Sequence, residues 1–85
     1  MDIYYSSKFA KEYKKLSLKT KISAERKEKI FRIDPFDPQL KTHRLEGKLK
    51  DYYSFSIDYH YRIIFEVVNK STVWFHAVGT HSIYE

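Results

Sequence analysis

The sequence predicts an α+β fold in which a helical hairpin packs on one face of a small, mainly antiparallel sheet. Apolar and polar residues alternate over 52–57, 61–68 and 72–78, which is typical of strands with one buried face. Apolar residues recur at helical spacing over 7–33, after a short β-favouring segment at 2–5. The element order is therefore β-α-α-β-β-β, with the first strand at an edge of the sheet.

The composition limits the chain to one small domain, 1–85, and to few kinds of chemistry. A chain of 85 residues buries roughly 60–65% of its unfolded surface, and an aromatic share of 18% supplies large rings for the core. The absence of cysteine excludes disulfides, thiolate metal sites and thiol nucleophiles. Since the sequence has no membrane-length apolar run and no apolar signal region, we expect a cytoplasmic protein without membrane contact.

The charge is unevenly distributed along the chain. Residues 1–33 hold ten Lys/Arg against four Asp/Glu, whereas residues 52–85 hold two against three. The predicted helices are therefore basic and the sheet is nearly neutral. A nucleic acid or an acidic protein is the natural complement, and a merely solubilising lysine-rich surface is the alternative.

Each predicted helix follows a serine that offers an N-cap hydroxyl, at 6–7 and at 17. The second helix ends before the two prolines of 34–38, because proline lacks the amide and restrains the residue before it. The expected core face of the first helix comprises Phe9, Tyr13 and Leu16. The expected buried stripe of the second, which also includes the stem of Arg26, comprises Leu18, Ile22, Ile30 and Ile33.

Residues 39–51 are expected to form a loop, which is long for so small a domain. Long ordered loops are often functional, and Leu40, Leu45 and Leu49 are expected to pin this one to the core.

The strands are expected to bury one face under the helices and expose the other. The core-facing residues of the first two meander strands are Tyr53, Phe55, Ile57, Tyr61, Ile63, Phe65 and Val67. Their opposite face carries Tyr52, Ser54, Ser56, Arg62, Ile64, Glu66 and Val68. In the last strand Val73, Phe75 and Ala77 share one face, and Trp74, His76 and Val78 share the other. We expect the face that carries Arg62 to be the working face.

Three short motifs punctuate the second half of the chain: His43-Arg44-Leu45-Glu46-Gly47, Tyr61-Arg62-Ile63-Ile64-Phe65 and Val78-Gly79-Thr80-His81. Their order and spacing resemble the RelE/ParE superfamily of toxins from type II toxin–antitoxin modules. The resemblance spans nearly the whole chain and is closest to the RelE, YoeB and YafQ branches, which are mRNA interferases.

The resemblance implies a toxin that inhibits translation by cutting mRNA in the A site of the 30S ribosomal subunit, without a metal or other cofactor. Such enzymes activate a ribose 2′-hydroxyl against the neighbouring phosphate, leaving a 2′,3′-cyclic phosphate and a 5′-hydroxyl. It also implies a cognate antitoxin, whose acidic, partly disordered segment matches the cationic helices.

The resemblance assigns catalytic roles to four residues. His43 is the candidate base, Arg62 stabilises the phosphate, His81 is the candidate acid, and Tyr84 stacks on a base or assists proton transfer. Each of the first three also has a structural alternative. In these alternatives His43 holds the turn at Gly47, Arg62 forms an ion pair with Glu66 or Asp58, and His81 is an exposed chain end.

Further residues are candidates for holding the RNA, namely Lys48, Lys50, Ser54, Ser56 and His60. Some of these depart from the resembled branches. The RelE branch has lysines where Ser54 and Ser56 stand, and the YafQ branch has a histidine near Ser56. Relatives often place an aromatic residue where Glu85 stands, one position after Tyr84.

Two alternative functions are compatible with these motifs. One is a ParE-like DNA gyrase inhibitor without ribonuclease activity, and the other is an inactive relative that only binds an antitoxin. A zinc site is not expected, because no carboxylate or cysteine joins His76 and His81 at ligand spacing.

Overall fold

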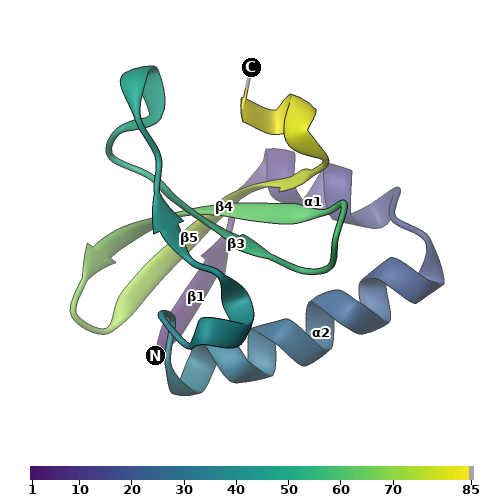
Figure 1. The fold of residues 1–85 in the computed structure, drawn as a ribbon, viewed down its shortest axis with the longest axis horizontal. Coiled ribbons are helices and arrows are strands. Elements are labelled where there is room, and N and C mark those ends of the chain that lie inside the picture. The colour runs from purple at the N-terminus through teal and green to yellow at the C-terminus, as the bar shows by residue number, and fades with distance from the viewer. Residues whose placement is uncertain (85) are drawn as a thin grey trace.

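The structure, a computed structural model, describes residues 1–84. Its elements are β1 (Asp2–Tyr5), α1 (Ser7–Lys14), α2 (Leu18–Ile33), η1 (Pro38–Leu40), β2 (His43–Arg44), η2 (Gly47–Leu49), β3 (Tyr53–Ser56), β4 (Arg62–Asn69), β5 (Thr72–Gly79) and η3 (His81–Tyr84), where η marks a 3₁₀ turn. The two helices cover one face of a five-stranded sheet with the order β1-β5-β4-β3-β2 (Figure 1). β1 is parallel to β5 and all other neighbours are antiparallel, so the predicted α+β class and the edge position of the first strand are confirmed.

The predicted loop at 39–51 contains a strand that the sequence pattern does not reveal. β2 pairs with β3, placing His43 opposite Ser54 and Arg44 opposite Tyr53. Two residues are too few to show alternation, so this strand forms only because β3 offers its edge. Leu40 is fully buried in the core cluster, which confirms that this leucine pins the segment to the core, whereas Leu45 and Leu49 are half-buried outside the cluster.

Serine caps begin both helices, as the sequence predicts. The Oγ of Ser6 accepts the N–H of Phe9 at 2.9 Å, and the Oγ of Ser17 accepts the N–H of Thr20 at 3.2 Å. Phe9 is buried, and Tyr13 and Leu16 pack partly buried against the core, so the predicted face of α1 is confirmed.

The predicted buried stripe of α2 is wrong. Leu18, Ile22 and Ile33 are exposed, by 74%, 50% and 89%, Arg26 is exposed too, and only Ile30 remains half-buried. The buried residues are instead Thr20, Ala24 and Phe31, on the opposite side of the helix. The ring of Phe31 reaches the sheet and fills the space between α2 and the strands.

Phe31 lies at the centre of an aromatic core formed with three strand residues. Its ring centroid is 4.9 Å from that of Phe55, 4.9 Å from that of Phe65 and 5.3 Å from that of Phe75. Each of these rings is fully buried. Stacked and edge-to-face contacts of this kind add to the hydrophobic stabilisation of a small core.

The predicted faces of β5 are correct up to His76, whose ring centroid lies 5.1 Å from that of Trp74, and wrong for Ala77 and Val78. Phe75 pairs with Phe65 and Ala77 with Ile64, so His76 is the extra residue of a β-bulge. The bulge shifts the phase of the strand, and Val78 rather than Ala77 joins the core cluster. Beyond the end of β1, the backbone of β5 bonds to side chains of α1 and its N-cap. Ser6 Oγ donates to the His76 carbonyl at 2.8 Å, and a Glu12 carboxylate oxygen accepts the Val78 N–H at 3.1 Å.

The sheet face opposite the helices is partly covered. Ser54, predicted to point outward from this face, is fully buried, because the C-terminal turn η3 packs over it. Among residues 1–84, no helix combines the length and apolar character that a membrane crossing requires.

Candidate functional site

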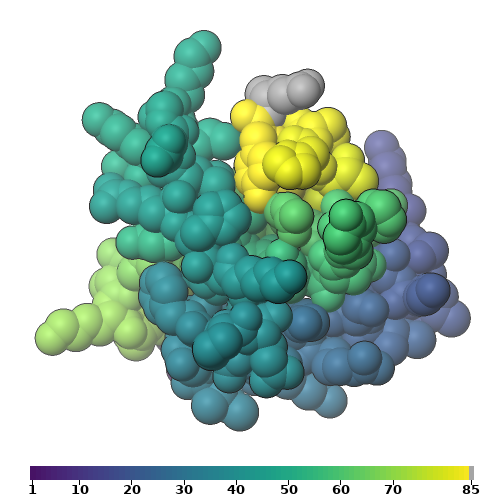
Figure 2. All heavy atoms as spheres, in the orientation of Figure 1, coloured from purple at the N-terminus to yellow at the C-terminus, as the bar shows by residue number. Residues whose placement is uncertain are grey.

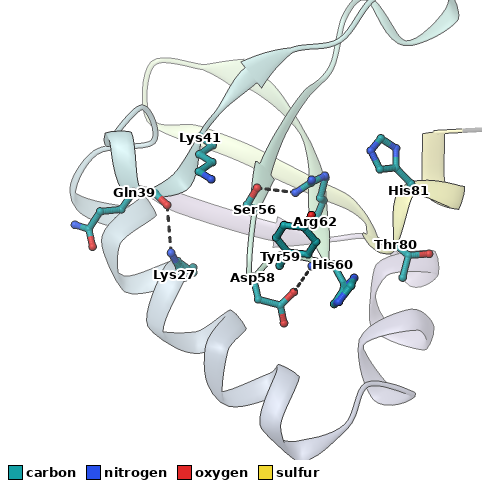
Figure 3. A pocket seen from close by; sticks show the side chains of 10 residues that line it. All are labelled: Lys27, Gln39, Lys41, Ser56, Asp58, Tyr59, His60, Arg62, Thr80 and His81. Carbon is teal, nitrogen blue, oxygen red and sulfur yellow. Dashed lines mark hydrogen bonds between the residues drawn. The ribbon is translucent and has the colours of Figure 1, made fainter.

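A cavity of about 660 Å³ opens at the end of the sheet beside Arg62. In Figure 2 the yellow C-terminal segment and the green β3–β4 hairpin lie on one side of this region, and the teal segment after α2 lies on the other. Its lining comes from α2, the η1 segment, the β3–β4 hairpin and the start of η3 (Figure 3). The residues are Lys27, Gln39, Lys41, Ser56, Asp58, Tyr59, His60, Arg62, Thr80 and His81.

Arg62 begins β4 and lies in register between Ser56 and Gly79. Its guanidinium is half-buried, and Nη1 donates to the Ser56 Oγ at 2.7 Å. Within residues 1–84 the arginine forms no ion pair: Glu66 contacts His76 at 2.9 Å, and Asp58 accepts backbone N–H groups. Ser56 therefore braces one guanidinium nitrogen, and the remaining N–H groups are available for a ligand.

His81 lies at the start of η3, exposed, on the same cavity. Its ring meets the ring of Tyr84 edge-on, with the centroids 5.1 Å apart. The Tyr84 hydroxyl is 2.7 Å from the Oγ of the buried Ser54. Tyr84 thus anchors η3 to the sheet, and Ser54 serves this anchor rather than the cavity. Glu85, which stands where relatives often have an aromatic residue, is outside the described residues.

His43 is exposed on β2 and does not line the cavity. Its Nδ1 lies 3.2 Å from the backbone oxygen of Lys41, and in register it stands opposite Ser54. Lys41 itself does line the cavity, and it is the one non-glycine residue among 1–84 with a positive φ, +53°. The structure therefore joins His43 to the cavity through the backbone of Lys41.

Apart from the buried Ser54, the residues predicted to hold RNA divide into two groups. Ser56 and His60 line the cavity together with Arg62 and His81. Lys48 and Lys50 are exposed on the η2 segment, which Figure 1 shows rising away from the helices, and they lie outside the lining. The backbone oxygen of Lys50 accepts the Nε–H of Arg44 at 2.8 Å, which closes this segment on itself.

Sequence reasoning missed three prominent lining residues, Lys27, Lys41 and Tyr59. Lys27 follows Thr20 and Ala24 at helical spacing, so the correct stripe on α2 would have pointed to it. Its Nζ donates to the backbone oxygen of Gln39 at 3.2 Å. No local pattern separates Lys41 or Tyr59 from an ordinary loop residue.

The cavity is cationic. Lys27, Lys41 and Arg62 contribute positive charge, whereas its single carboxylate, Asp58, bonds to the N–H groups of His60 and Tyr61 at 2.8 Å each. Such a site suits a phosphodiester, and imidazoles beside it can donate or accept protons. In the described chain no cluster of three or more His, Asp or Glu side chains has the geometry to hold a metal ion.

The fold is similar to those of solved toxins. YafQ from E. coli strain BL21(DE3) matches at a TM-score of 0.72 with 22% identity, over 98% of this chain and 96% of that one. The YoeB/ParE toxin from Agrobacterium tumefaciens matches at 0.81 with 15% identity, over 95% and 99%. The E. coli DinJ–YafQ complex matches at 0.69 with 23% identity, over 96% and 94%. No curated protein sequence matches the chain significantly.

A sequence model of one family covers almost the whole chain. The model described as a bacterial toxin of type II toxin–antitoxin system, YafQ, matches residues 1–84. This match confirms the family that the three motifs indicate, and within it the YafQ branch. The chain belongs to the YafQ family of toxins of type II toxin–antitoxin systems.

Proposed function

We propose that this toxin is an endoribonuclease that inhibits translation by cleaving mRNA bound to the ribosome. The observation that carries the proposal is the cationic cavity in which Arg62, braced by Ser56, lies among the residues that also include His60 and His81. Cleavage through the neighbouring 2′-hydroxyl needs a base, an acid and a cation for the pentavalent phosphorane. The lining and its immediate surroundings supply all three.

Arg62 stabilises the phosphorane, because a guanidinium on a rigid strand presents several N–H donors in a fixed plane. His81 protonates the leaving 5′-oxygen. His43 takes the proton of the 2′-hydroxyl through Nε2, since its Nδ1 faces the oxygen of Lys41. His60 is the second candidate for the base, because it lines the cavity while His43 stands outside it.

The proposed partner in the cell is an antitoxin with an acidic segment that is disordered when free. The relative YafQ has been solved in complex with DinJ, and a YoeB toxin from Staphylococcus aureus in complex with YefM. The basic helices of this chain suit such a segment. Binding would cover the cationic surface that RNA needs.

The test is incubation of the purified toxin with ribosomes that carry a defined mRNA, with mapping of the new ends. We expect cleavage at the Mg²⁺ level that the ribosomes need, with no other metal added, and new ends that carry a cyclic phosphate and a 5′-hydroxyl. Intact mRNA together with inhibited gyrase supercoiling would favour the ParE-like function instead. Intact mRNA with normal supercoiling, but with antitoxin binding retained, would identify an inactive relative.

A further inference from the structure

We propose that the Tyr59 side of the cavity is a binding subsite for the unpaired nucleotide adjacent to the cleaved bond. Tyr59 stacks on its base, and Lys41 with Lys27 binds its phosphate. This subsite rests on the proposed ribonuclease function for its place in the reaction, although its ability to bind a nucleotide does not depend on cleavage. The ligand of this subsite is single-stranded RNA, because a base stacked inside a duplex has no free face for Tyr59.

Tyr59 is a large aromatic residue that the fold leaves in water. Its side chain is 88% exposed at the tip of the β3–β4 hairpin, yet it lines the cavity three residues before Arg62. In the view of Figure 3 its ring projects between Asp58 and Arg62. Stacking on a base would remove one face of the Tyr59 ring from contact with water, and it would not require a particular base.

The hairpin tip that carries Tyr59 is held in place by its own hydrogen bonds. One Asp58 oxygen accepts the N–H groups of His60 and Tyr61, and the N–H of Ile57 bonds to the Tyr61 oxygen at 2.9 Å. The ring of His60 packs edge-on against that of Tyr59, with centroids 5.1 Å apart. A tip fixed in this way is organised before a ligand arrives, so little conformational entropy is lost on binding.

Lys41 occupies the cavity wall at a conformational cost. It ends η1 with φ +53° and ψ +39°, the left-handed region in which a side chain is disfavoured and glycine is the usual residue. A lysine rather than a glycine at this position places an ammonium group on the cavity, as Figure 3 shows. Strained residues of this kind concentrate at functional sites, which supports a ligand role for the side chain.

Lys27 approaches the same space from α2. Its Nζ donates to the backbone oxygen of Gln39 at 3.2 Å, which holds the ammonium beside η1. Lys27 and Lys41 thus lie on the wall formed by α2 and η1, and Tyr59 and Arg62 lie on the wall formed by the hairpin (Figure 3). A nucleotide between the two walls would place its base on Tyr59 and its phosphate between the ammonium groups and the guanidinium.

The first experiment is an NMR titration with a trinucleotide of 2′-O-methyl adenosine, which has no 2′-hydroxyl nucleophile. We expect shifts of the Tyr59 ring and of the amides of 39–41. Tyr59→Ala should weaken binding tenfold or more, while Tyr59→Phe keeps most of it.

Lys41→Met should weaken binding and lower the salt dependence by about one ion, whereas Lys41→Arg restores both. The matched controls are Tyr4→Ala and Lys70→Met, both at exposed positions outside the cavity.

The second experiment measures single-turnover cleavage on mRNA-programmed ribosomes. Tyr59→Ala should raise the toxin concentration for half-maximal rate while the maximal rate stays within threefold of the wild type. A wild type that cleaves, with Tyr59→Ala equal to it in both assays, would overturn the subsite and leave the proposed function standing. A trinucleotide that binds through Tyr59 to a toxin that cuts no mRNA would keep the subsite and refute the ribonuclease function.

Discussion

Arg62 combines a rigid backbone with an incompletely used side chain. Its strand is paired on both sides, to Ser56 and to Gly79, so the Cα cannot move without disturbing the sheet. One guanidinium nitrogen donates a hydrogen bond to Ser56, and the rest of the side chain lines a cationic cavity. Because a structural arginine at this depth would more often pair with a carboxylate, the geometry favours a ligand role.

At this residue we predict that Arg62→Ala abolishes cleavage while the fold survives. Loss of a preorganised charge at the phosphorane should lower the rate by about a hundredfold or more, and loss of a half-buried arginine should change stability by only about 0.5 kcal/mol. Arg62→Lys should recover little, because lysine lacks the planar fork. The measurement is the cleavage rate beside thermal melting; a variant that melts and cleaves like wild type would remove Arg62 from the site.

Tyr5 offers a prediction about pH. Burial, and then the hydrogen bond that its hydroxyl donates to Glu28 at 2.8 Å, raise the pKa of Tyr5 above its usual 10.0. The folded state therefore holds this proton more tightly than the unfolded chain. Its stabilisation is present below pH 10.0 and is lost as pH rises from there through the folded pKa. Above pH 10 the denaturant midpoint of Tyr5→Phe should fall less steeply than that of the wild type. A difference between the two midpoints that stays constant with pH would contradict this.

At the scale of the element, α2 shows how one large ring can decide which face of a helix is buried. Three branched residues on one side compete with Phe31 on the other, and Phe31 is buried because its ring packs against three phenylalanines of the sheet. The orientation also brings Lys27 to the cavity. The reverse orientation would have pointed Lys27 into solvent.

We predict that Phe31→Ala lowers the free energy of unfolding by about 3 to 5 kcal/mol, whereas Leu18→Ala changes it by about 0.5 kcal/mol or less. The first substitution opens a cavity among three packed rings, and the second removes an exposed side chain. Denaturant unfolding of both variants measures the contrast. Equal losses would show that α2 packs through the other face.

At the end of η1, Lys41 has a disfavoured left-handed backbone and its side chain lines the cavity. We predict that Lys41→Gly raises the free energy of unfolding by about 0.5 to 1 kcal/mol, since glycine relieves the left-handed strain at φ +53°. The same variant should bind RNA more weakly, because it loses an ammonium group from the cavity. Calorimetry and the trinucleotide titration measure the two effects; a variant that is destabilised would show that the backbone there is not strained.

At the scale of the whole molecule, charge and chemistry occupy different elements. Residues 1–33 contain ten of the sixteen Lys/Arg residues, while the cavity depends on the ends of β3 and β4 together with η1 and η3. The basic helices can therefore attract a polyanion or an acidic segment by long-range steering, and under the proposed function the cavity would then bind the phosphodiester.

We predict that the complex with the cognate antitoxin weakens steeply with salt. Most lysines and arginines of the helices are exposed, and salt screens exposed charges beyond a Debye length of about 8 Å at physiological ionic strength. Titration calorimetry at 50, 150 and 500 mM salt, about a tenfold range, measures the dependence. An affinity that is unchanged across this range would show that apolar contacts, such as those of the exposed Leu18 and Ile22, hold the partner instead.

The sequence by itself determined the parts of this protein that depend on local rules. Serine capping, the proline stop after α2 and the period of two in β3 and the first half of β4 each arise within a few residues, so the element order and the outward side of Arg62 were predictable. The three motifs likewise identified the family, because they are local and keep their spacing.

Only the tertiary structure decided the features that depend on which surfaces meet. The bulge at His76 forms where α1 replaces β1 beside β5, and β2 exists only as a partner of β3. The buried face of α2 was a competition between two stripes, and the packing of the Phe31 ring against the sheet resolved it. For the same reason the cavity could not be read in advance: Lys27, Lys41 and Tyr59 belong to three separate segments, and only long-range contacts bring them to Arg62.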